Sequence, residues 1–306
     1  MTTSSPFDLV LDCDPGIDDA LALFLAAAPT PRWTLRAVTT VAGNRPLAHT
    51  TRNARALLAL AGRSDVPVHA GAAEQLDGQP ARTNLIHGED GLGGVPLPEG
   101  RPADDEPADV ALCRLLNAAA PGTLTLVAVG PLTNLARAER RQPGVLARAG
   151  TLAVMGGAVD VPGNVSPAAE FNVWADPLAA AEVLRAHPAI RLFGLDVTSQ
   201  AAMSSEWIAG LGALGGRCAA AARAMLGAYA AKDPLLHDAC PLVHLLDPSL
   251  FEGRWRALTV ETAQGEQEGR TRPAEPTHGQ PLTEVVHRAE GPALLAHVRA
   301  ALARLP

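Results

Sequence analysis

An excess of positive charge is missing from this 306-residue sequence, which has 25 Lys and Arg residues, 32 Asp and Glu residues and a net charge of −7. Binding to nucleic acid or to an anionic membrane surface requires clustered Lys and Arg side chains. We therefore expect neither, and we expect a small molecule as partner. Aromatic residues are scarce at 3%, whereas hydrophobic residues make up 47% and are largely Ala and Leu. This composition is typical of an enzyme with many helices and an aliphatic core.

Other signals are absent as well. The four cysteines, Cys13, Cys113, Cys218 and Cys240, are widely spaced and follow no metal-binding or disulfide pattern, so we expect them to be reduced and buried. The N-terminus lacks a basic segment followed by an apolar core, and no apolar run is long enough to span a bilayer. We therefore expect a cytoplasmic protein. No repeat, long linker or low-complexity tract divides residues 1–306, which predicts one domain.

Acidic residues are concentrated near the N-terminus. Asp12, Asp14, Asp18 and Asp19 fall within eight residues, where a short apolar strand is followed by a turn and a predicted helix. Like charges at this spacing repel, and burial raises the pKa of a carboxyl group unless a cation or hydrogen-bond donors compensate. Oxygen ligands without a Cys or His cluster favour calcium or magnesium over zinc. Any one of these Asp residues could simply cap the helix or hold the turn, but we do not expect all four to do so.

Short apolar runs alternate with helix-like segments along most of the chain. Such runs occur at residues 9–13, 35–41, 67–71, 124–130, 151–157 and 190–196. Near-continuous apolar strands that alternate with helices indicate a parallel sheet covered on both faces. Towards the C-terminus the pattern predicts helices within 204–246, the last opening at 235–240, strands at 256–262 and 282–287, and a helix at 292–305. We predict an α/β fold with a mainly parallel central sheet flanked by helices and a helical C-terminal part.

Polar residues outside these regular patterns follow the predicted strands. In a doubly wound sheet the loops after the strands converge on one edge, so a single pocket could hold them all. Several Asp, Asn and Glu side chains around a hard cation would suit a ligand with neighbouring hydroxyl groups, such as a sugar. The residues are Asp14, Asp18, Asp19, Asn44, His87, Asn164, Glu170, Asn172, His237 and Asp238.

Many of these residues lie in short motifs. The run from Asp12 to Asp19, Asp-Cys-Asp-Pro-Gly-Ile-Asp-Asp, resembles the N-terminal fingerprint of the nucleoside hydrolases of the inosine-uridine-preferring type. Together with Glu170-Phe171-Asn172 and His237-Asp238 this motif is highly specific. The resemblance extends through most of the chain and implies the Rossmann-like fold of that family. Further motifs in the family's order are at residues 39–44, 86–91, 130–134, 155–157, 163–164 and 175–177.

The resemblance implies calcium-dependent hydrolysis of the N-glycosidic bond of a ribonucleoside, which yields free base and ribose. By position, Asp14, Asp19 and Asp238 would ligate one calcium ion together with the main-chain carbonyl of Val129. Asp14 would also take a proton from the water that attacks C1′. His237 resembles the family's general acid, and an imidazole pKa near ~6.5 allows it to protonate the leaving base.

The resemblance also assigns residues to the substrate. Asp18, Asn44, Asn164, Glu170 and Asn172 would hold the ribose hydroxyl groups. Two contacts stay open: His87 either contacts the base or only stabilises its glycine-rich loop, and Tyr229 either stacks on the base or, as we favour, packs in the core. Residues 225–237 are shorter and less aromatic than in several relatives, so base preference is not predicted. A homodimer or homotetramer is expected from the resemblance alone.

Alternative interpretations remain for the same residues. Asp12 and Asp14 could serve a magnesium-dependent phosphatase, although we find no convincing basic residue for a phosphate. A calcium-dependent nucleoside or ribose binder without catalysis is a third possibility, which the retained Asp14 and His237 disfavour. Asp12 is interpreted as structural support and Asp176 as a helix N-cap. His244 follows His237 by two helical turns but completes no zinc motif, so it is interpreted as structural.

Overall fold

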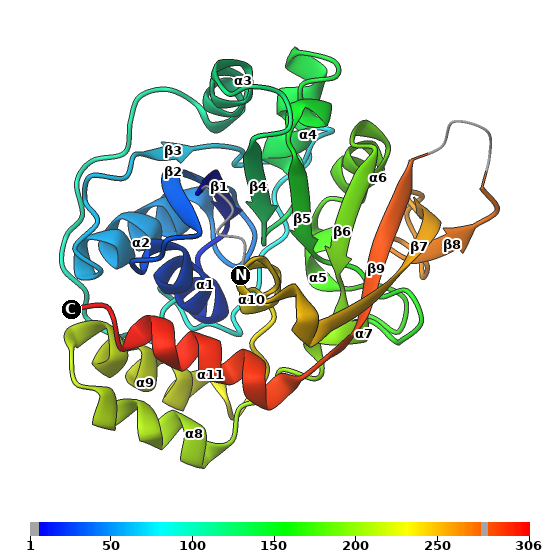
Figure 1. The fold of residues 1–306 in the computed structure, drawn as a ribbon. Helices are drawn as coiled ribbons and strands as arrows, with labels where there is room; N and C mark the ends of the chain where they lie inside the picture. Colours follow the sequence, from blue (N-terminus) through cyan, green and yellow to red (C-terminus); the bar gives the residue numbers. More distant parts are fainter. Residues whose placement is uncertain (1–5, 277–280) are drawn as a thin grey trace.

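A single nine-stranded sheet forms the centre of the molecule in the computed structural model, which describes residues 6–276 and 281–306 (Figure 1). Its strand order is β3-β2-β1-β4-β5-β6-β9-β7-β8. All neighbouring strands are parallel except β7, which is antiparallel to both β8 and β9. The mainly parallel sheet predicted from the sequence is therefore confirmed. The strands are β1 (Phe7–Cys13), β2 (Trp33–Thr40), β3 (Val68–Ala70), β4 (Leu124–Ala128), β5 (Thr151–Met155), β6 (Ala189–Phe193), β7 (Phe251–Val260), β8 (Thr271–Ala274) and β9 (Leu282–Ala289).

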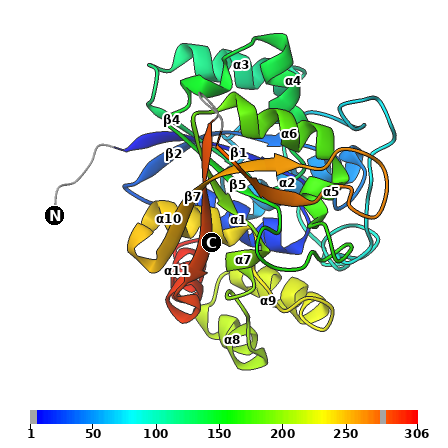
Figure 2. The ribbon, with the colours of Figure 1, turned by 90° about the vertical axis from the view of Figure 1, so that its right-hand side faces the viewer.

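Helices cover both faces of the sheet (Figure 2). One face is covered by α1 (Ile17–Ala27), α2 (Leu47–Leu60), α9 (Arg217–Tyr229), α10 (Ala239–Leu246) and α11 (Gly291–Leu302). The other face is covered by α3 (Ala108–Ala118), α4 (Thr133–Arg141) and α6 (Pro177–Ala186). The shorter elements are α5 (Phe171–Ala175), α7 (Leu195–Thr198), α8 (Ser205–Gly210), η1 (Leu146–Arg148), η2 (Leu211–Leu214) and η3 (Pro248–Leu250).

Helix α1 is the most deeply buried helix on its face, because every one of its residues is buried. Its sequence is apolar on all sides after the first turn, as expected of a helix enclosed by others, here α2, α9, α10 and α11. The two acidic residues of its first turn, Asp18 and Asp19, benefit from the positive end of the helix dipole. The side chain of Asp19 also accepts a hydrogen bond from Gly16 N, which closes the N-terminus of the helix. Burial of α1 thus places two carboxylates directly beyond the end of β1.

Three predicted elements differ from the structure. The strand predicted at 190–196 ends at Phe193, because Gly194 caps the short helix α7. The helix predicted to open at residue 235 begins at Ala239; before it, Met203 N donates to Pro234 O and Leu236 N donates to Ala201 O, which keeps this segment extended. Strand β7 begins at Phe251, before the predicted residue 256. Helix α3 and strand β8 were not predicted at all.

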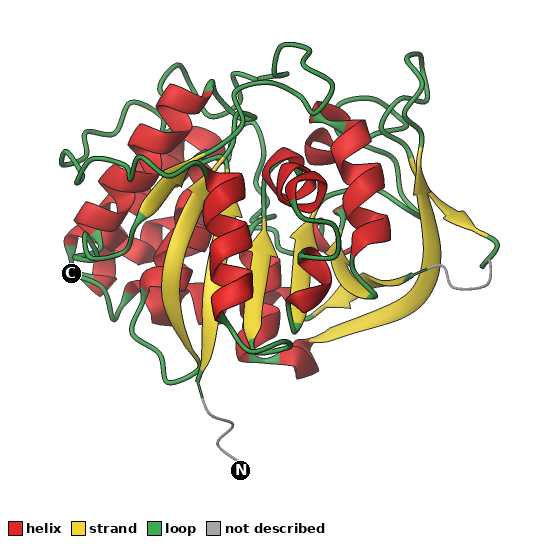
Figure 3. Ribbon diagram, turned by 90° about the horizontal axis from the view of Figure 1, so that it is seen from above, coloured by secondary structure: helices red, strands yellow, loops and turns green. Residues whose placement is uncertain are grey.

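The carboxyl ends of the parallel strands lie along one edge of the sheet (Figure 3). The strand order reverses between β1 and β4, which is where doubly wound sheets bind their ligands. Asp14 follows β1 at this point and Val129 follows β4. Among the described helices, none combines the length and apolar character needed to cross a membrane.

Candidate active site

Four buried carboxylates meet at the reversal of the strand order. The loop after β1 is held by Asp19, whose two carboxylate oxygens accept from Asp14 N at 3.1 Å and Gly16 N at 3.0 Å. The same carboxylate lies within hydrogen-bonding reach of the carboxyl groups of Asp14 and Asp238. Asp238 comes from the other end of the chain, where it immediately precedes α10. The fold therefore brings together two motifs more than 200 residues apart.

Three of these residues form a group suited to a metal ion. Asp18, Asp19 and Asp238 each offer a carboxylate oxygen, and the three oxygens lie within 4.8 Å of one another. The predicted ligand set contained Asp14 in place of Asp18. The carboxylate of Asp14 nevertheless contacts that of Asp19, and its Oδ1 atom is buried without a hydrogen-bond partner among the described residues. A buried carboxylate oxygen with no donor is suited to a cation.

The electrostatics of the cluster also favour a bound cation. Burial, followed by the charges of neighbouring Asp residues, raises the pKa of Asp14 and of Asp238 well above the usual range. Burial and the charge of Asp19 raise the pKa of Asp18 to about 7. Folding therefore works against the simultaneous ionisation of these groups unless positive charge is added. An all-oxygen donor set with this much negative charge fits a hard divalent cation.

Two glycines make room for Asp14. A Cβ atom added at Gly130 would lie 2.5 Å from Asp14 Oδ1, and one at Gly43 would collide with Oδ2. We predict that Gly130→Ala displaces this carboxylate and lowers the free energy of unfolding by about 1–3 kcal/mol, as expected for overpacking. Gly227→Ala is the matched control: it lies within α9, nothing lies within 4 Å of its added Cβ, and we expect about 0.5–1 kcal/mol of stabilisation. Urea denaturation of both variants tests this, and equal effects would contradict it.

All five predicted ribose contacts line the pocket beside the cluster, and several of them are also held by other protein groups. Asn44 donates from its backbone N to Asp14 Oδ2 at 2.6 Å and from its side chain to Asp19 Oδ2 at 2.9 Å, so it also supports the carboxylates. Glu170 caps α5, and its carboxylate accepts from the backbone N atoms of Gly157, Asn172 and Val173.

Asn172 and Asn164 complete this side of the pocket. The side-chain amide of Asn172 donates to Val129 O at 2.9 Å, so the predicted metal ligand Val129 is oriented by a predicted ribose contact. Asn164 is exposed, and its Oδ1 accepts from Phe171 N at 2.9 Å, which ties the loop before α5 to that helix.

His237 is held from both of its ring nitrogens. Its Nδ1 lies 2.7 Å from Thr198 Oγ1, and its Nε2 lies 3.2 Å from Asp233 Oδ2. Burial disfavours the charged imidazolium, but the hydrogen bond to Asp233 and nearby carboxylate charges outweigh it, so the pKa of His237 is raised. A buried imidazole that favours its protonated form is chemically suited to donate a proton.

The sequence did not single out Thr198 or Asp233 as functional. Thr198 comes from the short unpredicted helix α7, and nothing in its local sequence marks it. Asp233 lies four residues before His237, and a carboxylate at that spacing from a candidate acid was the signal in the sequence that could have identified it.

His87 and Tyr229 form one wall of the pocket. His87 Nδ1 accepts from Ile17 N at 3.1 Å, which ties the glycine-rich loop to the start of α1. Its ring stacks on that of Tyr229, with centroids 5.1 Å apart and planes at 18°. Burial lowers the pKa of His87 to about 3, so this imidazole is neutral. Tyr229 is 2% exposed and belongs to the core, as favoured from the sequence, yet it also lines the pocket.

The pocket is acidic and polar. Among the described residues that line it, none is Lys or Arg, so it offers no fixed cation to a phosphate group. This speaks against the phosphatase alternative. Asp12 lies outside the lining and accepts from Thr39 Oγ1 and Asn134 Nδ2, in keeping with a supporting position. Asp176 caps α6 as predicted, and His244 packs against Phe193 and Phe251.

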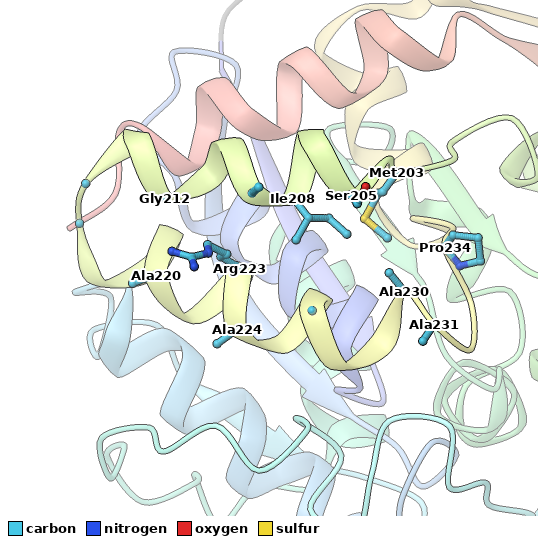
Figure 4. Close-up of a pocket in the computed structure, with 14 residues that line it drawn as sticks. Met203, Ser205, Ile208, Gly212, Ala220, Arg223, Ala224, Ala230, Ala231 and Pro234 are labelled. Carbon is cyan, nitrogen blue, oxygen red and sulfur yellow. The ribbon is translucent and has the colours of Figure 1, made fainter.

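A larger groove lies elsewhere on the surface, between α8 and α9 (Figure 4). It measures about 810 Å³ and is lined mainly by Ala, Gly and other apolar residues. Its polar side chains are Ser205 and Arg223. The described residues of this lining include no carboxylate and no imidazole, so we assign the acid–base chemistry to the acidic pocket.

A doubly wound α/β sheet with a cluster of buried carboxylates and an imidazole at its switch point defines an enzyme whose acidic pocket can hold a metal ion. The particular family is given by comparison with known proteins. The sequence profile of the inosine-uridine preferring nucleoside hydrolases matches residues 9–296, and the chain belongs to that family. It is accordingly an N-glycosidase.

Relatives agree in sequence and in structure. The chain is 38% identical over 272 residues to the pyrimidine-specific ribonucleoside hydrolase RihA of Shewanella woodyi, covering 86% of each chain. Among solved structures, a plant nucleoside hydrolase, PpNRh1, has a TM-score of 0.87 at 32% identity and covers 97% of this chain and 99% of its own. A purine-preferring ribonucleoside hydrolase of Gardnerella vaginalis has a TM-score of 0.89 at 27% identity, with 97% and 98% covered. The predicted fold is confirmed.

Proposed function

We propose that this enzyme hydrolyses the N-glycosidic bond of ribonucleosides with the help of one calcium ion. The observation that carries the proposal is the buried carboxylate cluster beside an imidazole, in a pocket whose described lining contains no Lys or Arg. Asp14, Asp19, Asp238 and the carbonyl of Val129 would hold the ion. A bound calcium ion supplies Lewis acidity, which lowers the pKa of a water molecule and orients it.

The protein's own side chains would supply the proton transfers, the charge stabilisation and the contacts to the ribose. Oδ1 of Asp14, which has no donor among the described residues, accepts the proton of the attacking water as its oxygen bonds to C1′. The C1′–N bond breaks with oxocarbenium character, and the carboxylates of Asp18 and Glu170 stabilise the developing positive charge. His237 gives the proton of Nε2 to the departing base. Asn44, Asn164 and Asn172, with Asp18 and Glu170, hold the ribose hydroxyl groups.

Substrate entry requires the pocket to widen. Its free volume is about 50 Å³, whereas sites for small molecules usually enclose about 300–1,000 Å³. The loops that carry Ile86 and Asn164 form part of the lining and would move apart to admit a nucleoside. On the resemblance alone, we extend the proposal to a cytoplasmic homodimer or homotetramer whose residues 1–306 form one domain.

The test is release of ribose from uridine, cytidine, inosine and adenosine by the purified enzyme. We expect release from at least one nucleoside and no phosphate release from sugar phosphates. Calcium and nucleoside binding without any release over hours would favour the non-catalytic binder instead.

A further inference from the structure

Asp233 presents a fixed oxygen to the pocket. Its Oδ1 accepts from Leu235 N at 3.1 Å, and its backbone is anchored because Met203 N donates to Pro234 O at 2.7 Å. With Oδ1 occupied, Oδ2 is the atom that reaches His237 Nε2. Pro234, the next residue, faces away from the pocket into the groove between α8 and α9 (Figure 4). The Asp233 carboxylate is therefore held in one orientation, in which Oδ2 is the oxygen available to a ligand in the pocket.

The pair of atoms forms a donor beside an acceptor. Because Thr198 engages Nδ1, the Nε2 edge of His237 is the one that faces the pocket. Asp233 Oδ2 lies 3.2 Å from it and, as a carboxylate, can only accept. The hydrogen bond to His237 lowers the pKa of Asp233 against the opposing effect of burial, which keeps the group ionised. A base that takes the Nε2 proton replaces this hydrogen bond, and Oδ2, left without its donor, is then best matched by an N–H group beside the protonated atom of the base.

We infer that Asp233 is a specificity-determining residue, which selects nucleobases that carry an N–H donor beside the atom protonated by His237. The inference rests on the proposed function. In a pyrimidine the atom that takes the proton is O2, because it is conjugated to the glycosidic nitrogen. The neighbouring N3 is a donor in uracil but an acceptor in cytosine. In a purine the atom is N7, and its neighbour is the amino group of adenine or the carbonyl oxygen of hypoxanthine.

The donor or acceptor beside the protonated atom predicts which nucleoside has the higher kcat/KM, among the pyrimidines and among the purines. Uridine should exceed cytidine, and adenosine should exceed inosine, by about tenfold or more in kcat/KM, because an acceptor facing an acceptor leaves both groups unpaired. In Asp233→Asn the amide oxygen must face Leu235 N, so the amide nitrogen takes the place of Oδ2 and can only donate. Both ratios should therefore fall to one or below.

The experiment measures kcat/KM for the four nucleosides with the wild type, Asp233→Asn and the control Asp160→Asn. Asp160 is an exposed carboxylate paired with Arg256 outside the pocket, so its variant should keep the wild-type ratios. An effect of Asp233→Asn that acts through His237 slows most the substrate whose base departs least readily as an anion, cytidine more than uridine, and so raises the uridine-to-cytidine ratio. A fall in that ratio therefore isolates base recognition, and a rise would overturn the inference. Uniform slowing with unchanged ratios would overturn the inference and leave nucleoside hydrolysis intact.

The wild-type enzyme tests the inference even if the variant does not fold. A wild type that hydrolyses cytidine faster than uridine would contradict the inference directly. Absence of ribose release from every nucleoside would instead overturn the proposed function, and this inference with it.

Discussion

Asp14→Asn should lower the rate of ribose release by at least about 10³-fold while leaving the enzyme folded. Oδ2 of Asp14 accepts from Asn44 N at 2.6 Å, so the asparagine oxygen must face that donor. The new amide nitrogen then occupies the position of Oδ1, which lies buried without a donor among the described residues. An amide there can neither accept a proton nor ligate a cation. Loss of a general base alone costs about 10²–10⁴-fold, and loss of a calcium ligand adds to it.

Two measurements separate these effects of Asp14→Asn. Calorimetry should show weaker calcium binding, and the rate at saturating calcium should remain low because the base is missing. Asp160→Asn removes an exposed carboxylate away from the pocket and should match the wild type in both. A variant that retains a tenth of the wild-type rate would rule out Asp14 as the base.

His237→Ala should slow nucleoside hydrolysis by about 10²–10⁴-fold yet spare a riboside with a p-nitrophenolate leaving group. A nucleobase departs poorly as an anion, so its departure depends on the proton from Nε2. Nitrophenolate is stable as an anion and needs no proton. The raised pKa of His237 supports this role, because a protonated imidazole is the form that can donate.

Comparison of the two leaving groups distinguishes proton donation from a structural role. Damage to the fold or to the ribose contacts would slow both substrates by the same factor. His297→Ala, on α11 and outside the pocket, serves as control and should change neither rate. Equal loss on both substrates in His237→Ala would mean that another group protonates the base.

The sheet could be predicted because its strands are nearly continuous apolar runs between helices. Burial on both faces removes the need for polar residues, so β1, β4 and β5 are visible without any knowledge of their neighbours. The extended backbone before α10 could not be predicted in this way. It forms because Leu236 pairs with Ala201, a contact between segments that are far apart in the sequence.

The acidic part of the site was predictable for a different reason. Asp14, Asp18 and Asp19 lie within one local motif, and their charge alone calls for a cation. The partners of His237 depend on tertiary contacts: Thr198 arrives from α7 after β6, and Asp233 from the segment after α9. Likewise, the sequence could not show that Asp18 groups with Asp19 and Asp238.

The most direct test of the account is ribose release from uridine by enzyme that has been stripped of metal with a chelator. Stripping should abolish release, and about one calcium ion per chain should restore it by filling the carboxylate cluster. The same titration on Asp14→Asn should restore nothing. Full turnover by the stripped enzyme, with the chelator still present and no metal detectable in the protein, would contradict the account.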